Sequence, residues 1–219
     1  MKKNDLKQAW IKLKKFWDFV WNDDSALSWV LNIIVAVVLI KFIIYPVLGF
    51  VLATPYPIVA VVSGSMEHDG NFDQFWGEQG LFYEKKDYRI GKEEFRDFPF
   101  HNGFNTGDIM ILYGTKPENL KIGDVLVFQG ARENPKAYPI IHRIIKIENT
   151  SQGLVFETKG DHNVNLINSC ESFGRDCVFE SDIREEQILG KAIIRIPYLG
   201  WVKIGAFEAV QKVRSLLFN

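Results

Sequence analysis

The longest apolar run in the chain extends from Ala26 to Ala53 and contains one charged residue, Lys41. About 20 apolar residues span the hydrocarbon core of a bilayer. The buried helix of a water-soluble protein seldom runs this long without a polar face. The pattern therefore predicts a single transmembrane anchor over residues 26–53, and Pro46 is expected to kink it.

The segment before this run, residues 1–25, combines basic and aromatic side chains. Its first 17 residues contain one acid, Asp5, and six lysines: Lys2, Lys3, Lys7, Lys12, Lys14 and Lys15. A basic flank favours the cytoplasmic side of a membrane, so we expect the N-terminus in the cytoplasm and the chain after Ala53 outside it. A cleavable signal peptide fits less well, because the apolar run is too long and begins too late. Interspersed aromatic residues predict an interfacial helix or a helical extension of the span: Trp10, Phe16, Trp17, Phe19 and Trp21.

Short runs of β-branched and aromatic residues, separated by glycines, follow the apolar segment. Six of these runs are predicted strands: 58–62, 108–113, 124–128, 140–147, 154–158 and 192–196. No helical periodicity of comparable strength occurs between residues 54 and 190. Residues 54–200 are therefore expected to form a mainly β domain with a compact antiparallel or mixed sheet.

Two further segments differ from this β pattern. The stretch 67–106 is rich in aromatic residues and acids, and it is expected to be a short helix near Lys92 to Phe95 or a loop. Connections this long in a compact domain are usually functional or poorly ordered. Residues 201–219 have apolar positions at helical spacing between charged ones, which predicts an amphipathic helix lying on the membrane or packed on the domain.

Composition narrows the class of protein further. The 219 residues are 47% hydrophobic and include 26 basic and 27 acidic residues. These values exclude a wholly disordered chain, a collagen-like repeat and a cysteine-stapled mini-protein. The net charge of −1 also argues against a nucleic-acid partner, because binding to phosphates requires a basic surface.

Cys170 and Cys177 are the only cysteines, and both are expected in a loop. If the domain lies outside the cytoplasm, a local disulfide is favoured over two free thiols. A metal site would need more ligands than the nearby His162 and Asp176 supply. No metal is therefore expected.

Three side chains have the residue types of a nucleophile, a base and an acid. Ser65 stands in Ser63-Gly64-Ser65-Met66, where the glycine permits a tight turn at the end of a predicted strand. A serine needs a base to remove its proton, and His142, inside a predicted strand, is the best base among four histidines. Asp161 follows the next strand, where a carboxylate can orient an imidazole. Taken singly, a core histidine and a turn aspartate are common structural residues.

The order of these motifs is more specific than any one of them. An apolar anchor is followed by VVSGSM, GDVLVF, IIHRIIKI, ETKGDHN and GKAIIRIPYLGW. From about residue 26 to residue 202 this arrangement resembles signal peptidase I of the archaeal and endoplasmic-reticulum type. The resemblance implies a membrane-anchored β domain with serine endopeptidase activity that removes signal peptides from exported preproteins after small residues. It implies no metal or organic cofactor, and it places the domain outside the cell membrane.

The resemblance also implies roles for particular residues. In this branch of the family a histidine replaces the lysine base of typical bacterial enzymes, and the sequence reads His142-Arg143 at that position. Ser65 would be the nucleophile, His142 the general base and Asp161 the acid. Ser63 or the backbone amide of Ser65 would stabilise the oxyanion. The substrate would add as a strand beside an edge strand made of Pro57, Ile58, Val59, Ala60, Val61 and Val62. Expected partners are preprotein signal peptides, membrane lipid and secretion machinery.

The chain departs from this family in three places. Members usually carry a further aspartate a few residues after the Gly-Asp motif, but residues 164–169 contain none. Asp176 and Asp182 come later and are alternative acids. His68 stands where a proline is usual. Residues 67–106 replace a short connection, and this insertion would cover the substrate strand, contact the membrane or bind a partner.

Two alternatives to this mechanism remain open at the level of sequence. A second enzyme hypothesis retains the fold but makes Lys146 or Lys159 the base. A hypothesis of a different class is a catalytically inactive, membrane-anchored module that binds preproteins or secretion partners.

Overall fold

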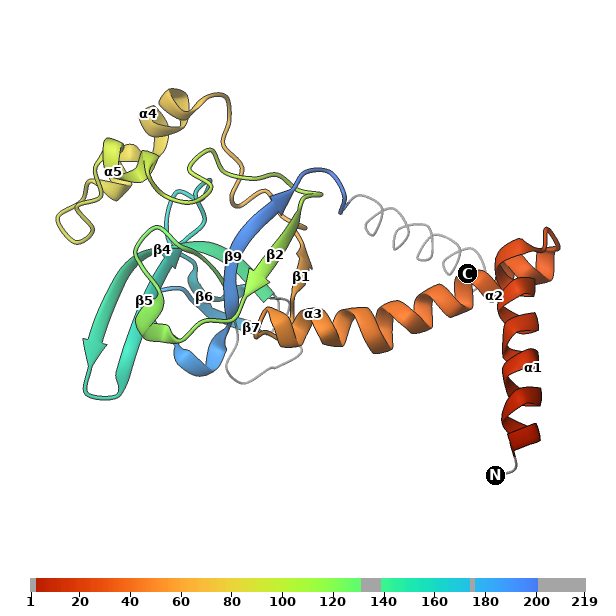
Figure 1. The fold of residues 1–219 in the computed structure, drawn as a ribbon. Helices are drawn as coiled ribbons and strands as arrows, with labels where there is room; N and C mark the ends of the chain where they lie inside the picture. The colour runs from red at the N-terminus through yellow and green to blue at the C-terminus, as the bar shows by residue number, and fades with distance from the viewer. Residues whose placement is uncertain (1–2, 131–138, 174–175, 201–219) are drawn as a thin grey trace. The chain divides into compact units, whose positions relative to one another are not determined.

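The computed structural model describes residues 3–130, 139–173 and 176–200, and leaves undescribed the side chains of residues 3–6, 169–173 and 176–177. The chain divides into two compact units, residues 1–51 and residues 52–219. Figure 1 shows the first as helices and the second as a curled sheet with short helices.

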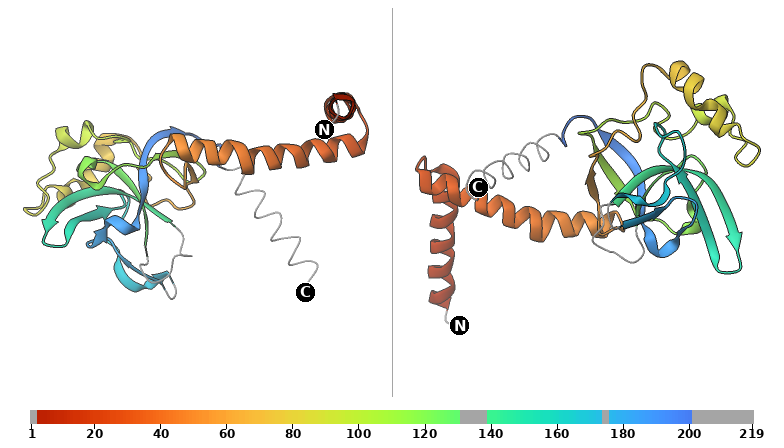
Figure 2. Two further views of the ribbon diagram at one scale, coloured as in Figure 1. Left: turned by 60° about the horizontal axis from the view of Figure 1, so that its bottom comes forward. Right: turned by 180° about the vertical axis from the view of Figure 1, so that it is seen from behind.

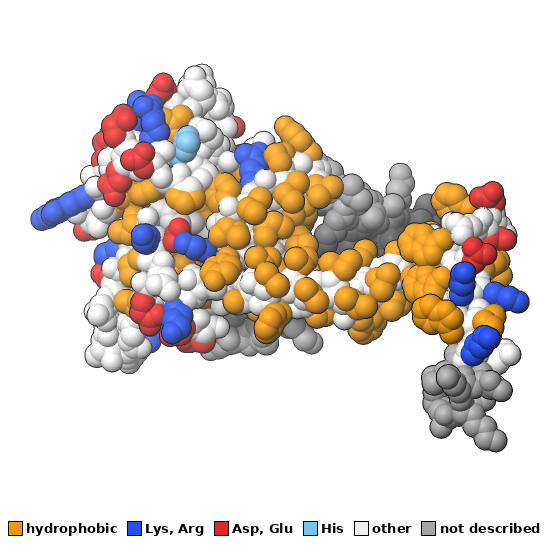
Figure 3. Space-filling view, in the orientation of Figure 1, with side chains coloured by type: hydrophobic (Ala, Val, Ile, Leu, Met, Phe, Trp, Pro, Cys, Tyr) orange, Lys and Arg blue, Asp and Glu red, His pale blue; other side chains and the backbone are white. Residues whose placement is uncertain are grey.

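The first unit contains the predicted anchor. Helix α2 (Ala26–Leu39), the π-helical segment η1 (Ile40–Ile44) and α3 (Tyr45–Val51) form one continuous apolar helix of 26 residues, long enough to cross a membrane. Its side chains are exposed along most of its length, and Figure 3 shows them as an almost unbroken hydrophobic surface. A long apolar helix whose side chains are mostly exposed has the kind of surface that lipid would cover.

The π-helical segment η1 lies directly before Pro46. A proline ring clashes with the carbonyl four residues earlier and removes one helical hydrogen bond. Tyr45 N–H instead bonds to the Ile40 carbonyl, five residues earlier. The widened turn therefore absorbs the clash without ending the helix.

The basic N-terminal segment forms α1 (Lys3–Asn22). Ser25 caps α2 by accepting a hydrogen bond from Ser28 N–H. The Ser28 hydroxyl in turn bonds to the carbonyls of Phe19 and Val20 at the end of α1. These contacts satisfy polar groups at the join between two helices, where the backbone lacks helical partners.

The second unit is built on one seven-stranded antiparallel sheet with the strand order β1-β2-β9-β3-β4-β5-β8. Its strands are β1 (Ile58–Ala60), β2 (Ile109–Tyr113), β3 (Val125–Gln129), β4 (Pro139–Thr150), β5 (Gly153–Lys159), β8 (Ile183–Arg184) and β9 (Ile188–Ile196). A separate pair comprises β6 (Asn168–Phe173) and β7 (Asp176–Phe179), and short 3-10 turns are η2 (Pro117–Asn119) and η3 (Glu185–Gln187). This confirms the mainly β fold and all six predicted strands, with shifted ends.

Two apolar clusters fill the interior of the sheet. One joins β1, β2, β3 and β9 through buried side chains such as Val61, Met110 and Val127. The other joins β3, β4, β5 and β8 around Phe128 and Phe156. These clusters form because alternate residues of each strand point to the same face.

A third cluster contradicts the expectation that residues 54–190 contain no strong helix. Residues 67–106 contain α4 (Phe72–Tyr83) and α5 (Lys92–Arg96), which Figures 1 and 2 show side by side. The sequence predicted either a short helix near α5 or a loop, and it did not predict α4. The cluster consists of Phe75, Trp76, Phe82, Tyr83, Ile90 and Phe95 from the insertion, with Ile145 from β4.

The sequence signal for α4 was weak because glycines lower helix propensity. Gly80 is required by packing: a Cβ there would lie 2.7 Å from Trp76 Nε1. A capping box between Asn71 and Gln74 begins the helix. Aromatic packing therefore outweighs the low propensity.

The segment around the cysteines also differs from prediction. Cys170 and Cys177 belong to the paired strands β6 and β7, rather than to a loop. Their side chains lie outside the described part, so the disulfide stays a prediction. Residues 201–219, the predicted amphipathic tail, are also outside the described residues.

Candidate active site

Ser65 lies in the turn after β1, where the edge strand leaves the sheet. Its carbonyl accepts a hydrogen bond from His162 N–H at 2.9 Å. The hydroxyl of Ser63 lies 3.2 Å from Ser65 Oγ. Ser65 is half-buried and Ser63 is exposed, so the turn holds two neighbouring hydroxyls at the surface.

His142 lies in β4, opposite Leu126 of β3, and its side chain is almost completely buried. Its Nε2 atom lies 2.9 Å from Ser65 Oγ. The fold therefore brings together two residues 77 positions apart in sequence. A hydroxyl within hydrogen-bond reach of an imidazole nitrogen is the arrangement of a nucleophile and its general base.

The second ring nitrogen of His142 faces a carboxylate that the sequence did not single out. Nδ1 contacts Glu180 Oε1, and Glu180 is fully buried. An Nδ1–H that donates to this carboxylate leaves Nε2 free to accept from the Ser65 hydroxyl. The three groups form a continuous chain from carboxylate to imidazole to hydroxyl.

Glu180 is held in place by both its backbone and its side chain. Its N–H donates to the Ile167 carbonyl, and its carbonyl accepts from Thr158 N–H. The carboxylate also accepts hydrogen bonds from Ile167 N–H and from Thr158 Oγ1. These contacts tie Glu180 to the end of β5 and to the segment before β6.

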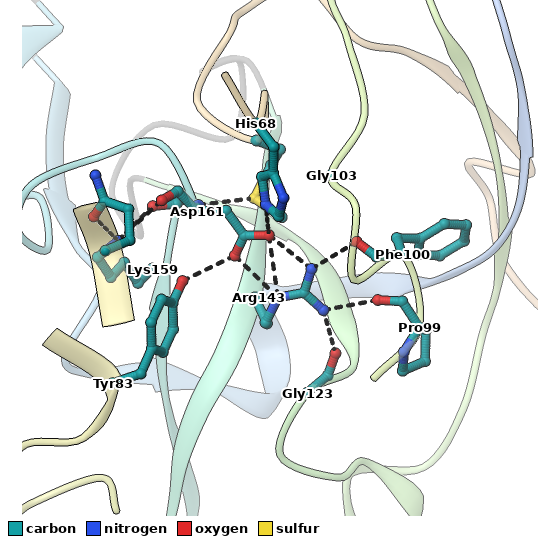
Figure 4. A network of polar contacts seen from close by, with 12 residues as sticks. His68, Tyr83, Pro99, Phe100, Gly103, Gly123, Arg143, Lys159 and Asp161 are labelled. Atoms are coloured by element: carbon teal, nitrogen blue, oxygen red, sulfur yellow. Dashed lines mark hydrogen bonds and ion pairs between the residues drawn. The ribbon is translucent and has the colours of Figure 1, made fainter. Parts of the chain in front are cut away.

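Asp161, the acid expected at His142, occupies a different buried site (Figure 4). Arg143 Nη2 lies 2.7 Å from Asp161 Oδ2, and Arg143 Nε lies 2.9 Å from Asp161 Oδ1. Tyr83 donates its hydroxyl to Oδ1 at 2.9 Å, and His68 Nε2 lies 3.0 Å from Oδ2. Successive residues of a strand point to opposite faces, so Arg143 and His142 reach different carboxylates.

Electrostatics makes Arg143 and Asp161 a stable ion pair. Burial alone would raise the pKa of Asp161, but Arg143 and the hydrogen bond from His68 hold it well below its usual range. Burial alone would lower the pKa of Arg143, and the Asp161 charge raises it instead. Burial and the nearby Asp161 charge raise the pKa of Tyr83 well above its usual value. Tyr83 therefore remains a hydrogen-bond donor to Asp161.

Of the two alternative acids, Asp182 has a described side chain, and its described contact is with Arg184, at 3.4 Å on a partly exposed surface, rather than with His142. Asp176 has no described side chain. The stretch 176–182 did contain the carboxylate that contacts His142, but residue type alone does not distinguish Glu180 from Asp182.

The two alternative lysines make contacts of other kinds. Lys146 Nζ pairs with Glu148 at 2.7 Å. Lys159 Nζ donates to the carbonyls of Gly160 and Asp161 and to Gln79 Oε1. Burial lowers the pKa of Lys159 to about 8. This lysine supports the turn beside the site rather than contacting the Ser65 hydroxyl.

Gly160 is packed against both Ser65 and His142. A Cβ at this position would lie 2.8 Å from His142 Nε2 and 2.8 Å from the Ser65 carbonyl oxygen. Contacts this short do not occur without displacement of a neighbour. The glycine therefore permits the close approach of the turn to the Ser65–His142 pair.

The predicted substrate strand lies at an edge of the sheet. β1 pairs with β2 on one side, and this pairing continues beyond both ends of β1. Leu112 N–H donates to the Pro57 carbonyl, and Val61 N–H donates to the Asp108 carbonyl. Residues 57–61 thus run extended along the sheet edge toward the Ser65 turn.

Comparison with known proteins agrees with this arrangement. The signal peptidase complex catalytic subunit sec11 of Sclerotinia sclerotiorum is 26% identical over 187 residues, 85% of this chain and 84% of the relative. The corresponding subunit SEC11 of Scheffersomyces stipitis is 25% identical over 170 residues, 77% and 76% of the two chains. Human SEC11C is 28% identical over 102 residues, 46% and 49% of the two chains. No protein-family model matches the chain.

This chain is a homologue of the signal peptidase catalytic subunits. The 187 aligned residues exceed the length of the unit 52–219, so the similarity extends into the helical unit. Signal peptidase homology supports a peptidase that processes signal peptides, and the apolar helix agrees with a membrane protein.

Proposed function

We propose that this chain is a membrane-bound serine endopeptidase that removes signal peptides from exported preproteins. Ser65 is the nucleophile, His142 is the general base, and Glu180 orients the imidazole. The observation that carries the proposal is the chain of contacts from Glu180 through His142 to Ser65 Oγ. It supplies the base that a serine hydroxyl requires in order to react.

The first half of the reaction forms an acyl-enzyme. Ser65 Oγ attacks the carbonyl carbon of the scissile peptide bond while His142 Nε2 takes the hydroxyl proton. The tetrahedral intermediate then collapses, the carbon–nitrogen bond breaks, and His142 gives the proton to the leaving amine. Glu180 stabilises the imidazolium between these two transfers.

The second half returns the enzyme to its starting state. His142 takes a proton from water, which attacks the ester carbonyl, and the proton passes to Ser65 Oγ as the carbon–oxygen bond breaks. Ser63 is the proposed oxyanion donor because its hydroxyl lies 3.2 Å from Ser65 Oγ. The Ser65 backbone amide is the second proposed donor.

Substrate recognition follows from the edge position of residues 57–62. An extended peptide adds to a free strand edge through backbone hydrogen bonds, and alternate side chains enter pockets. We propose that these pockets accept small residues before the cleaved bond. The anchor keeps enzyme and preprotein in one membrane, which raises their effective concentration.

The proposed orientation places residues 1–25 in the cytoplasm and the β unit outside the cell membrane. The lysine-rich flank supports this orientation, because positive flanks are retained on the cytoplasmic side. A protease domain on the outer side meets signal peptides at the end of their translocation. Signal peptides, lipid and the secretion machinery are the proposed partners.

The test is cleavage of a preprotein with an Ala-X-Ala site by membranes that contain the full chain. We expect Ser65→Ala and His142→Ala to lower the cleavage rate by at least about 10³-fold, because the members of such a triad act as a unit. Ser63→Ala should lower it by about 10²-fold to 10³-fold, the effect of losing an oxyanion donor. Ser151→Ala, an exposed serine in the β4–β5 turn, is the matched control.

Mass measurement of the products locates the cleaved bond. Undiminished cleavage by Ser65→Ala or His142→Ala would contradict the mechanism. Specific binding of preprotein without cleavage by the wild type would instead support the inactive binding module.

A further inference from the structure

The insertion 67–106 contacts the buried Arg143–Asp161 ion pair, which lies beside Ser65 and His142. Its aromatic cluster packs against Ile145 of β4. At this residue a β-bulge shifts the register of β4 against β5. The His68 ring stacks on Phe75 with a centroid separation of 3.5 Å and an interplanar angle of 6°. The insertion therefore packs against the strand that carries His142.

Four groups of the insertion contact the Arg143–Asp161 pair (Figure 4). Tyr83 and His68 bond to the two carboxylate oxygens of Asp161. The backbone carbonyls of Pro99 and Phe100 accept from Arg143 at 2.7 Å and 3.0 Å. Without the insertion, the ion pair would keep its internal hydrogen bonds and the one to the Gly123 carbonyl, but it would lose these four, which help to make burial of the charges tolerable.

The ion pair is in turn connected to both catalytic residues. Arg143 follows His142 directly in β4. Asp161 N–H donates to Met66 Sδ, next to Ser65, and the neighbouring His162 N–H donates to the Ser65 carbonyl. A displacement of Asp161 would thus shift the Ser65 turn and the His142 strand relative to each other.

We propose that the insertion is a positioning element of the catalytic centre and that Tyr83 is its main positioning residue. Tyr83 is fully buried and its hydroxyl reaches only the carboxylate of Asp161 among the contacts described. It acts through Asp161 and contacts neither substrate nor the reacting atoms. The inference rests on the proposed roles of Ser65 and His142.

The closing experiment compares Tyr83→Phe with Tyr88→Phe in the full chain in membranes. Each change removes one hydroxyl from the insertion, but Tyr88 bonds to Glu157, away from Asp161. We expect Tyr83→Phe to lower kcat by about 10-fold to 100-fold, because small displacements of reacting groups slow catalysis strongly. KM should change less than 2-fold, since the substrate edge 57–62 is untouched. Tyr88→Phe should leave both constants unchanged.

A second pair of variants does not depend on the stability of Tyr83→Phe. His68→Gln keeps a donor for Asp161, whereas His68→Phe keeps the ring stack on Phe75 and removes the donor. We expect His68→Gln to retain more kcat than His68→Phe at equal thermal stability. Such a rescue by a hydrogen-bond donor would not follow from a packing role alone.

Ser65→Ala, assayed in parallel, separates the two proposals. Cleavage by the wild type, none by Ser65→Ala, and wild-type kcat in both Tyr83→Phe and His68→Phe would overturn the positioning role and leave the proposed function standing. Cleavage that survives Ser65→Ala would refute the proposed function itself.

Discussion

In the part of the chain that the structure describes, two buried histidine–carboxylate pairs differ in their third partner. In the first, Glu180 contacts His142 Nδ1 and the opposite ring nitrogen faces the Ser65 hydroxyl. In the second, Asp161 contacts His68 Nε2, and within the described residues the opposite nitrogen has no hydrogen-bond partner. A histidine and a carboxylate therefore belong to a candidate catalytic triad in one place and form a structural bond in the other.

The electrostatic surroundings explain this difference. Asp161 is already neutralised by the Arg143 guanidinium, so its charge is used to stabilise a permanent cation. The described contacts of Glu180 are the His142 ring, a hydroxyl and a backbone N–H. A carboxylate without a permanent cation can stabilise an imidazolium when it forms. A histidine beside a carboxylate is thus not sufficient evidence of catalysis.

Among the variants that test the difference between the two pairs, Glu180→Gln is expected to lower activity most. An amide in place of the carboxylate removes the charge that stabilises the imidazolium and permits the wrong tautomer of His142. We expect kcat to fall by about 10³-fold to 10⁴-fold, the scale of such a change in a serine triad. Cleavage kinetics of the membrane-bound enzyme measure it. Asp182→Asn, a nearby and partly exposed acid, is the control, and equal losses in both variants would refute the assignment.

The main expected effect of Asp161→Asn is a lower free energy of unfolding. The change leaves Arg143 buried without its charged partner, which costs about 3–5 kcal/mol in comparable buried pairs. Thermal unfolding of the full chain in detergent measures this loss. Because the pKa of Asp161 is lowered in the folded state, its contribution is present above the unfolded value of 3.8 and is lost as pH falls below it. A difference between wild type and variant that does not shrink in acid would contradict this account.

Gly160→Ala tests whether the turn at Gly160 must pack closely against Ser65 and His142. The added methyl would overlap both His142 Nε2 and the Ser65 carbonyl. We expect about a 10²-fold loss of kcat/KM, the scale of a displacement near 1 Å at reacting groups. Gly77→Ala on α4 is the control, since a Cβ there meets nothing within 4 Å. Full activity of Gly160→Ala would show that this close approach is not required for catalysis.

The smallest effect concerns Lys159, beside the Asp161 pair. Its pKa is lowered to about 8 by burial, against 10.5 in the unfolded chain. Between these values the unfolded state binds more protons, so the contribution of Lys159 to the free energy of unfolding rises with pH. We expect a rise of at most about 3 kcal/mol over the interval between the two pKa values, since one pKa unit corresponds to about 1.4 kcal/mol.

The measurement for Lys159 is the difference in stability between wild type and Lys159→Met from pH 8 to pH 10.5. Lys146→Met, at a surface lysine paired with Glu148, should show no such rise. If the difference in free energy of unfolding between wild type and Lys159→Met does not change between pH 8 and pH 10.5, the pKa of Lys159 is not lowered by burial.

Prediction from sequence succeeded where a local pattern determines the structure. The strands around Val127 and His142 follow from β-branched runs, and the anchor follows from uninterrupted hydropathy. Prediction failed for α4, because two glycines weaken the helical signal and only the contacts of its aromatic residues stabilise it. It also missed β6, β7 and β8, which are short and depend on pairing partners.

The same division holds for the candidate site. The anchor, the β fold, the Ser65 and His142 candidates and the resemblance to signal peptidases could be predicted from the amino-acid sequence, because these depend on local composition and motif order. The carboxylate that contacts His142 could be identified only from the three-dimensional fold. Backbone and side-chain hydrogen bonds to Thr158 and Ile167, which lie 22 and 13 positions away, hold Glu180 beside the ring. Such pairings depend on how strands are joined in space, so a linear pattern of acidic residues does not reveal them.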